Sequence, residues 1–278
     1  MTRSLRILAV TALAGSLAAT ALPAAAPAKK KSKPAVITLS GATGSAPLVA
    51  LLAKKYVKTH PGKAKFKLAQ GGGEVGVQDA AAGRVTIGNA ARDPLPTDPN
   101  GLVFYPIAKD SICFAVNKQN GISNLTLKQR QDIWTGVIRD WSQIPGSNIT
   151  GTIDLIGRTS ASSQPPLVQS LLLGNKKIST LASLKASDGL VRQSIINDKR
   201  AIGHLSGTYT HDGKVKPLAA DGVGCNLANT KSGQYPAVRT YYEVTRGKAT
   251  GQAAKFIYWA QKSKPARKIT TKVAVPLN

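Results

Sequence analysis

Acidic residues are scarce in this chain of 278 residues, where 13 Asp and Glu stand against 38 Lys and Arg, a formal net charge of +25. The acids are dispersed and offer no close carboxylate pair of the kind that general acid–base catalysis uses. The basic excess favours anionic partners, which include a small anion, an anionic envelope polymer and nucleic acid. A solvated basic surface near an anionic cell envelope would carry the same excess. The charge alone therefore does not decide between this interpretation and an anionic partner.

Aromatic residues are also few, at 5% of the chain, and they are spread out. Binding of single-stranded nucleic acid uses clustered aromatic stacking platforms, so we expect no nucleic-acid partner. The histidines, His60, His204 and His211, have no metal-ligand spacing, and the chain lacks both H-E-x-x-H and G-x-S-x-G. We therefore expect no metal, no other cofactor and no enzymatic activity.

One long apolar run is present, over residues 7–22, between Arg3 and Arg6 on one side and small residues at 24–28 on the other. This order is typical of a signal peptide, predicted over residues 1–28, and the run is shorter than the ~20 apolar residues of a spanning helix. Without a nearby Cys, a lipoprotein anchor at that point is excluded. Residues 29–34 (KKKSKP) are predicted to be a basic, disordered lead-in. We expect a soluble mature chain that is secreted, periplasmic or held in the cell envelope.

Cysteine is limited to Cys113 and Cys225. In an exported chain such a pair is most simply a disulfide. Two buried free thiols are the alternative, because the sequence does not show that the two side chains meet.

Short apolar strands alternate with amphipathic helices, which predicts an α/β fold. At three places a predicted strand ends in a loop of small residues and a helix follows, with strands over residues 35–39, 66–69 and 153–156. A helix N-terminus presents unpaired N–H groups and the positive end of its dipole, and small residues let an anion approach the backbone. Three such loops in one cleft would bind an oxyanion. The third adds Arg158, whose guanidinium suits oxyanions.

The order of these segments resembles the substrate-binding proteins of phosphate ABC importers, in the wider family of periplasmic binding proteins. The resemblance is carried by residues 39–47 (LSGATGSAP), 70–74 (QGGGE) and 87–92 (IGNAAR). Its most specific stretch runs over residues 124–141, with NLT, DIWTG and a final DW. Further matches are AIG at 201–203, Tyr235-Pro236 and Arg239.

The resemblance implies a two-lobed α/β fold of the type II periplasmic-binding-protein class, with two crossing hinge strands. It places the first lobe at residues 35–112 and 241–278 and the second at residues 113–240. The crossings would lie at residues 111–116 and 241–245, and a disulfide between Cys113 and Cys225 would lie beside the hinge. The implied partners are a small oxyanion, with phosphate as the leading candidate, and an ABC importer permease. We expect a monomer.

The same resemblance supplies the candidate ligand-binding residues, which lie in the three loops and in the segment after the third strand. They are Thr43, Gly44, Ser45, Gly73, Glu74, Arg92, Arg158, Ser162, Ser163 and Gln164.

Several of these positions depart from the family pattern. Glu74 stands where a serine is expected, Gln164 replaces a threonine, and Ala161 and Ser163 replace glycines. Ala91 or Arg92 falls where some relatives carry an Asp that accepts a proton from phosphate. These changes weaken the case for phosphate itself.

Structural roles are open alternatives at these positions. Glu74 could cap its helix or pair with an arginine, and Arg92 could pair with Glu74 or Asp93. Arg158 could form a salt bridge, and the serines at 160, 162 and 163 could be N-caps. The altered loops and the basic charge also support an alternative function, an exported envelope-interaction or adhesion protein without tight oxyanion binding.

Overall fold

The computed structural model describes Met1 and residues 33–277. The predicted signal peptide apart from Met1, and the lead-in apart from Lys33 and Pro34, lie outside the described residues. From Lys33 onward the chain clusters as one compact unit. Within the described part, no helix combines the length and the apolar character needed to cross a membrane.

Nine strands form one sheet, in the order β2-β1-β3-β11-β4-β8-β6-β7, with β9 paired to β4. β1 pairs in parallel with β2 and β3, and β6 pairs in parallel with β7 and β8. The strands β11 and β4 join these two parallel groups through antiparallel pairs. The alternating pattern in the sequence therefore predicted the α/β class correctly.

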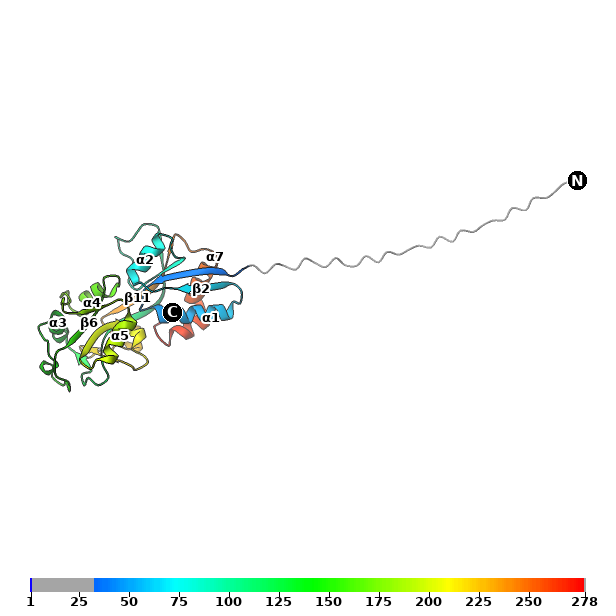
Figure 1. The fold of residues 1–278 in the computed structure, drawn as a ribbon. Helices are drawn as coiled ribbons and strands as arrows, with labels where there is room; N and C mark the ends of the chain where they lie inside the picture. Colours follow the sequence, from blue (N-terminus) through cyan, green and yellow to red (C-terminus); the bar gives the residue numbers. More distant parts are fainter. Residues whose placement is uncertain (2–32, 278) are drawn as a thin grey trace. The chain divides into compact units, whose positions relative to one another are not determined.

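Two large hydrophobic cores divide this sheet into two lobes. The first lobe contains β1 (Ala35–Gly41), α1 (Ala46–Thr59), β2 (Ala64–Leu68), α2 (Gly73–Ala81), β3 (Ile87–Ala90), β11 (Val238–Arg246), α7 (Gly251–Lys262) and α8 (Lys264–Thr270). The second contains β5 (Asn124–Leu125), α3 (Leu127–Thr135), η1 (Trp141–Gln143), β6 (Asp154–Arg158), α4 (Gln164–Leu172), β7 (Ser183–Lys185), α5 (Asp188–Asn197), β8 (Ala201–Ser206), η2 (Gly207–Tyr209), β9 (Lys216–Pro217), β10 (Ala219–Ala220) and α6 (Leu227–Ser232). In Figure 1, α1, α2, α7 and β2 lie together, and α3, α4, α5 and β6 form the other group.

The long strand β4 (Leu102–Val116) passes from one lobe to the other. Its first part pairs with β11 as far as Ser111, and its second part pairs with β8 from Ile112. Ala108 packs in the first core and Ile112 in the second. The chain thus passes from the first core to the second between Ala108 and Ile112.

The strand β11 makes the second passage slightly earlier than expected. Ala237 packs in the second core and Tyr241 in the first, and Val238 pairs with Ser111. Residues 241–245 therefore pair within the first lobe. The passage lies around residues 237–240, beside the β4 passage.

Cys113 and Cys225 form a disulfide, with their Cα atoms 5.8 Å apart. Cys113 is in β4 directly after the passage between lobes, and Cys225 precedes α6. Both side chains pack in the second core. The disulfide predicted from the two cysteines is present, in the second lobe next to the crossing strands.

Short-range sequence signals stand at the ends of several helices. Thr126 and Gln129 form a reciprocal capping box at the start of α3, and Gly136 ends that helix in the left-handed conformation. The Ser187 side chain caps α5. The sequence did not predict the short helices α6 and α8, which lack a long periodic apolar pattern.

Candidate functional site

A buried carboxylate lies where the carboxyl ends of β1 and β6 meet. It belongs to Asp188, the first residue of α5, and its side chain is completely buried. Thr43 reaches it from the loop after β1, and Arg158 reaches it from the end of β6. The carboxyl ends of parallel strands are where α/β folds commonly place ligands. Thr43 comes from the first lobe and Arg158 from the second, so this site joins the lobes.

Both oxygens of Asp188 accept hydrogen bonds. Oδ2 accepts from Thr43 Oγ1 at 2.5 Å and from the guanidinium of Arg158, and Oδ1 accepts from Gln164 Nε2 at 2.7 Å and from the Ser206 backbone N–H at 2.7 Å. We call the four donor residues, Thr43, Arg158, Gln164 and Ser206, the anion cradle.

The Asp188 carboxyl is ionised in this setting. Burial by itself would raise its pKa, but the charges of Arg158 and Arg239 and the hydrogen bonds from Thr43 and Ser206 hold the pKa below its usual value. The cradle therefore already holds an oxygen anion, which is supplied by the protein itself.

Arg158 and Gln164 are each oriented by further contacts. Arg158 donates from Nε to Lys185 O at 3.1 Å and from Nη2 to Ala186 O at 3.1 Å. Gln164 Oε1 lies 3.1 Å from His204 Nδ1. Burial and the charge of Arg158 lower the pKa of His204 to about 3, so its ring is neutral near pH 7. A neutral ring protonated at Nδ1 donates to Gln164 Oε1, which leaves the amide group of Gln164 pointing at Asp188.

A second buried ion pair adjoins the cradle. Arg239 Nη2 lies 3.2 Å from Asp110 Oδ2, and the Ser206 hydroxyl donates to the same oxygen at 2.6 Å. Ser206 therefore contacts both Asp110 and Asp188. Gly44 packs against the ion pair of Arg239 and Asp110, since a Cβ at Gly44 would lie 2.8 Å from Arg239 Nη2. These residues pack the loop after β1 against the strands that cross between the lobes.

The other two predicted loops also meet across the lobes. Glu74 N–H donates to Ala161 O at 3.2 Å, and Ser163 Oγ donates to Ala91 O at 3.5 Å. A Cβ on Gly72 would lie 2.2 Å from Ala161 O, so glycine is required for this approach. The second and third small-residue loops are therefore in contact, as convergence in one cleft requires.

Ser45 and Ser162 are buried and make local hydrogen bonds. Ser45 Oγ donates to Ala42 O at 3.2 Å, and Ser162 Oγ accepts from the Gln164 N–H at 3.2 Å. Gly73 packs beside Ser163, whose Oγ would be 3.0 Å from a Cβ at Gly73. These three residues line the meeting loops, whereas Thr43, Arg158 and Gln164 contact the central carboxylate.

The side chains of Glu74 and Arg92 pair with each other. Arg92 Nε lies 2.8 Å from Glu74 Oε1, and Arg92 Nη2 lies 2.7 Å from Glu74 Oε2. The same guanidinium also donates from Nη2 to the carboxylate of Asp98. Burial would lower the pKa of Arg92, but the hydrogen bonds to both carboxylates raise it overall. The pairing of Arg92 with Glu74, one of the alternatives considered from the sequence, is what the structure contains.

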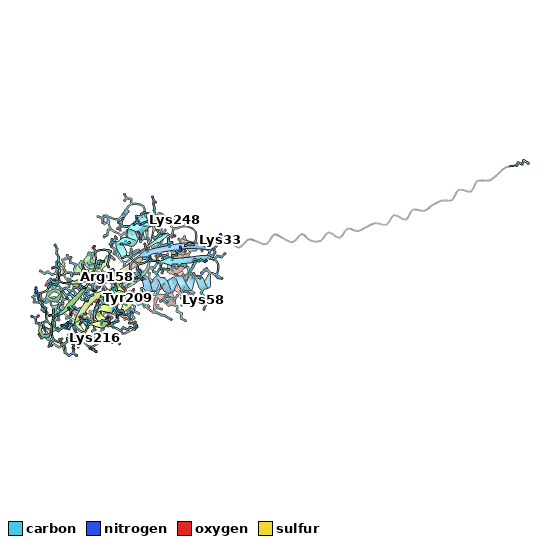
Figure 2. The ribbon with its side chains drawn as sticks, viewed as in Figure 1. Lys33, Lys58, Arg158, Tyr209, Lys216 and Lys248 are labelled. Carbon is cyan, nitrogen blue, oxygen red and sulfur yellow. A yellow bond between two sulfur atoms is a disulfide. The ribbon has the colours of Figure 1, made fainter. Side chains whose placement is uncertain are left out.

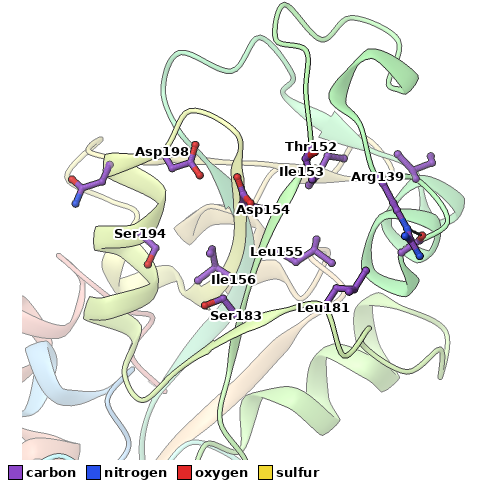
Figure 3. Close-up of a pocket in the computed structure, with 13 residues that line it drawn as sticks. Arg139, Thr152, Ile153, Asp154, Leu155, Ile156, Leu181, Ser183, Ser194 and Asp198 are labelled. Carbon is purple, nitrogen blue, oxygen red and sulfur yellow. Dashed lines mark hydrogen bonds between the residues drawn. The ribbon is translucent and has the colours of Figure 1, made fainter.

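A pocket of about 650 Å³ lies elsewhere, at the amino-terminal half of β6 (Figure 3). Ile153, Leu155 and Leu181 give it apolar walls, and Asp154 and Asp198 add carboxylates. Burial and the neighbouring Asp198 raise the pKa of Asp154. Arg139 also lines this pocket, but two carboxylates and apolar walls suit an oxyanion less well than the donors of the cradle, which lies at the opposite end of this strand. Figure 2 shows Arg158 and Tyr209 at the boundary between the two groups of elements.

Sequence reasoning missed Asp188, Ser206 and Asp110. One signal was available for Asp188, which directly follows the helix cap Ser187 in a chain with only 13 acids. An acid in the first turn of a helix is ordinarily explained by the helix dipole, and nothing local marks it as a partner of Arg158.

Two α/β lobes, joined by neighbouring crossing strands, meet over the buried anion cradle. The PBP superfamily domain matches residues 28–264, and the chain belongs to that superfamily.

Relatives with described roles match this chain over different lengths. The phosphate-binding protein PstS of Bacillus subtilis is 28% identical over 84% of this chain and 78% of its own. Phosphate-binding protein PstS 2 of Streptococcus agalactiae is 29% identical over 39% of this chain and 37% of its own.

Solved structures share the fold. A protein from Clostridium perfringens, described as a phosphate ABC transporter substrate-binding protein with bound phosphate, superposes with a TM-score of 0.80 at 24% identity. It covers 87% of this chain and 100% of its own. An ABC-type phosphate transport receptor from Vibrio cholerae superposes with a TM-score of 0.67 at 23% identity. It also covers 87% of this chain and 100% of its own.

Proposed function

We propose that this protein captures a small oxyanion outside the cytoplasm and delivers it to the permease of an ABC importer, with phosphate as the leading candidate. The observation that carries the proposal is the anion cradle, in which donors from two lobes surround one buried oxygen anion.

The cradle has the chemistry that an oxyanion needs. Its hydroxyl, amide, guanidinium and backbone N–H groups all donate hydrogen bonds, and charge-assisted bonds from arginine are the strongest of these. We assign ligand contact to Thr43, Arg158 and Gln164, and we add Ser206. Gly44, Ser45, Gly73, Ser162 and Ser163 line the loops around them. Glu74 and Arg92 are assigned to a structural ion pair beside the site.

The relatives support phosphate within this class of ligands, because those matched over most of the chain are phosphate-binding proteins. They do not favour the envelope-interaction alternative. We further propose a monomer without catalytic activity, exported by the signal peptide over residues 1–28. A disulfide suits an oxidising compartment, which supports the proposed location.

Calorimetric titration of the purified mature protein with phosphate and with sulfate tests the proposal. We expect saturable phosphate binding at micromolar affinity or tighter, with a rise in melting temperature in excess ligand. Binding of sulfate but not phosphate would keep the importer role and change the ligand. The absence of both heat and melting shift with either oxyanion would refute oxyanion capture.

A further inference from the structure

The carboxylate of Asp188 occupies the anion cradle as a ligand would. Each of its oxygens accepts two hydrogen bonds, and the donors include the side chains of Thr43, Arg158 and Gln164. These are the side chains assigned to the external oxyanion. The donors that an incoming anion needs are therefore already engaged by the protein.

The charges of the site are also matched within the protein. Arg158 pairs with Asp188 and Arg239 pairs with Asp110, and the side chains of all four residues are at most 3% exposed. Each guanidinium is thus matched by one carboxylate. An external anion entering beside an ionised Asp188 would meet like charge in a dry environment, where repulsion is strong. The two anions cannot share the cradle.

Asp188 also links the lobes. Its side chain accepts from Thr43 in the first lobe and from three residues of the second, and its backbone N–H donates to Thr43 Oγ1 at 3.2 Å. Tyr209, next to β8 in the second lobe, donates its hydroxyl hydrogen to Thr43 O at 3.0 Å. A closed arrangement of the lobes is therefore stabilised by an anion that belongs to the chain.

We propose that Asp188 is an internal competitor of the transported oxyanion, which keeps the empty protein closed and must leave the cradle before an external oxyanion binds. This inference rests on the proposed function of the same site. Asp188 is the first residue of α5, so a change of its χ1 rotamer would move the carboxylate without unwinding the helix.

Under competition of this kind, the apparent Kd equals the intrinsic Kd divided by the fraction of molecules whose cradle is free. Asp188→Asn keeps the size of the side chain and removes its charge. We expect phosphate to bind this variant at least about tenfold more tightly than the wild type, which corresponds to a competent fraction of about a tenth or less in the wild type. Without ligand the variant should melt at a lower temperature, because Arg158 loses its counterion.

Asp221→Asn is the matched control. Asp221 pairs with Arg130, whose side chain is 3% exposed, at 2.8 Å in the same lobe, but neither residue contacts the cradle. This variant also removes the carboxylate that pairs with a buried arginine. It should melt at a lower temperature and keep the phosphate affinity of the wild type.

Calorimetry with phosphate and sulfate on the wild type and both variants separates the outcomes. Tighter binding by Asp188→Asn alone supports the competitor. Equal or weaker binding by Asp188→Asn, with a wild type that binds, overturns the competitor and leaves the proposed function intact. No binding of either anion by any of the three proteins overturns the proposed function itself.

Small-angle scattering of the wild type gives a readout that needs no variant. If Asp188 holds the lobes together, the ligand-free and phosphate-saturated proteins have the same radius of gyration. A ligand-free wild type that is more open than the saturated form would overturn the inference.

Discussion

Arg92 holds the carboxylate of Glu74 through two hydrogen bonds, from Nε to Oε1 at 2.8 Å and from Nη2 to Oε2 at 2.7 Å. Both residues are ligand candidates by their place in the sequence, and the structure pairs their charges with each other. The acid at the start of α2 is therefore neutralised before any anion approaches, which removes the conflict between Glu74 and an anionic ligand.

Glu74→Gln should consequently have little effect. Arg92 keeps Asp98 as a partner, at 2.6 Å from Nη2 to Oδ1, and the Glu74 side chain is 36% exposed, so we expect a loss of stability of about 0–1 kcal/mol. The phosphate affinity measured by calorimetry should change by less than about threefold, a difference below 1 kcal/mol. A gain of tenfold or more would mean that the carboxylate faces the ligand.

Arg158→Ala should abolish oxyanion binding, because it removes the cationic member of the cradle. It also leaves Asp188 buried without its ion-pair partner, a change that typically costs about 3–5 kcal/mol. The double variant Arg158→Ala with Asp188→Asn relieves the unpaired charge. Circular dichroism should show it to be folded, and calorimetry should show no binding.

Arg130→Ala is the control for that pair of variants. Arg130 is as buried as Arg158 but binds Asp221, away from the cradle. It should be destabilised and should still bind phosphate. Retained binding in the Arg158 variants would refute the assigned site.

Gly72→Ala should weaken ligand binding without removing any donor. Gly72 has φ of +102°, and a Cβ there would lie 2.2 Å from Ala161 O of the other lobe. The added methyl group therefore blocks the contact between the second and third loops. Gly62→Ala, with φ of +71° and open space around it, controls for the strain of positive φ. We expect reduced affinity for Gly72→Ala only, and equal affinities for the two variants would contradict this role.

Removal of the disulfide should cost several kcal/mol. Cys113 and Cys225 are 112 residues apart, and chain-entropy reasoning gives about 4–5 kcal/mol for a loop of that length. Urea unfolding of the double variant Cys113→Ala and Cys225→Ala measures the loss. A thiol assay on unreduced, denatured wild type should find no free thiol, and two free thiols would contradict the bond.

Glu243 should make the stability depend on pH. It is fully buried in β11, and among the described residues neither of its carboxyl oxygens has a hydrogen-bond partner. Burial raises its pKa to about 8. Between its ordinary pKa and about 8, the folded protein keeps this proton and the unfolded chain loses it. The free energy of unfolding therefore falls as the pH rises through that window.

Glu243→Gln tests this because it is uncharged at every pH. Urea unfolding from pH 5 to pH 8 should show a shallower fall for the variant, and the variant should be the more stable protein at pH 8. Parallel pH profiles for the two proteins would show that Glu243 is already ionised in the fold.

The sequence predicted the secondary elements well where the signals are short-range. The capping box at Thr126, the cap at Ser187 and the small-residue loops act within a few residues of the chain. The strands expected over residues 66–69 and 153–156 are β2 at Ala64–Leu68 and β6 at Asp154–Arg158, so their ends differ from the expectation by one or two residues. Strand ends depend on pairing with other strands, which local pattern does not contain.

The residues alone predicted the α/β class, the three strand-to-helix loops and the oxyanion-binding character of Arg158, and the family resemblance added Thr43 and Gln164 as candidates. Tertiary structure alone decided which charges meet. Asp188 joins Thr43, 145 residues away, and Arg158, 30 residues away, in one buried site. Burial makes such pairs obligatory, because an unpaired ion in a dry interior is costly. The partner of each ion, however, is chosen by the folding of distant segments onto each other. The residues and the family resemblance therefore supplied three of the four donors of the cradle, without Ser206, and only the fold shows that the protein fills it with its own carboxylate.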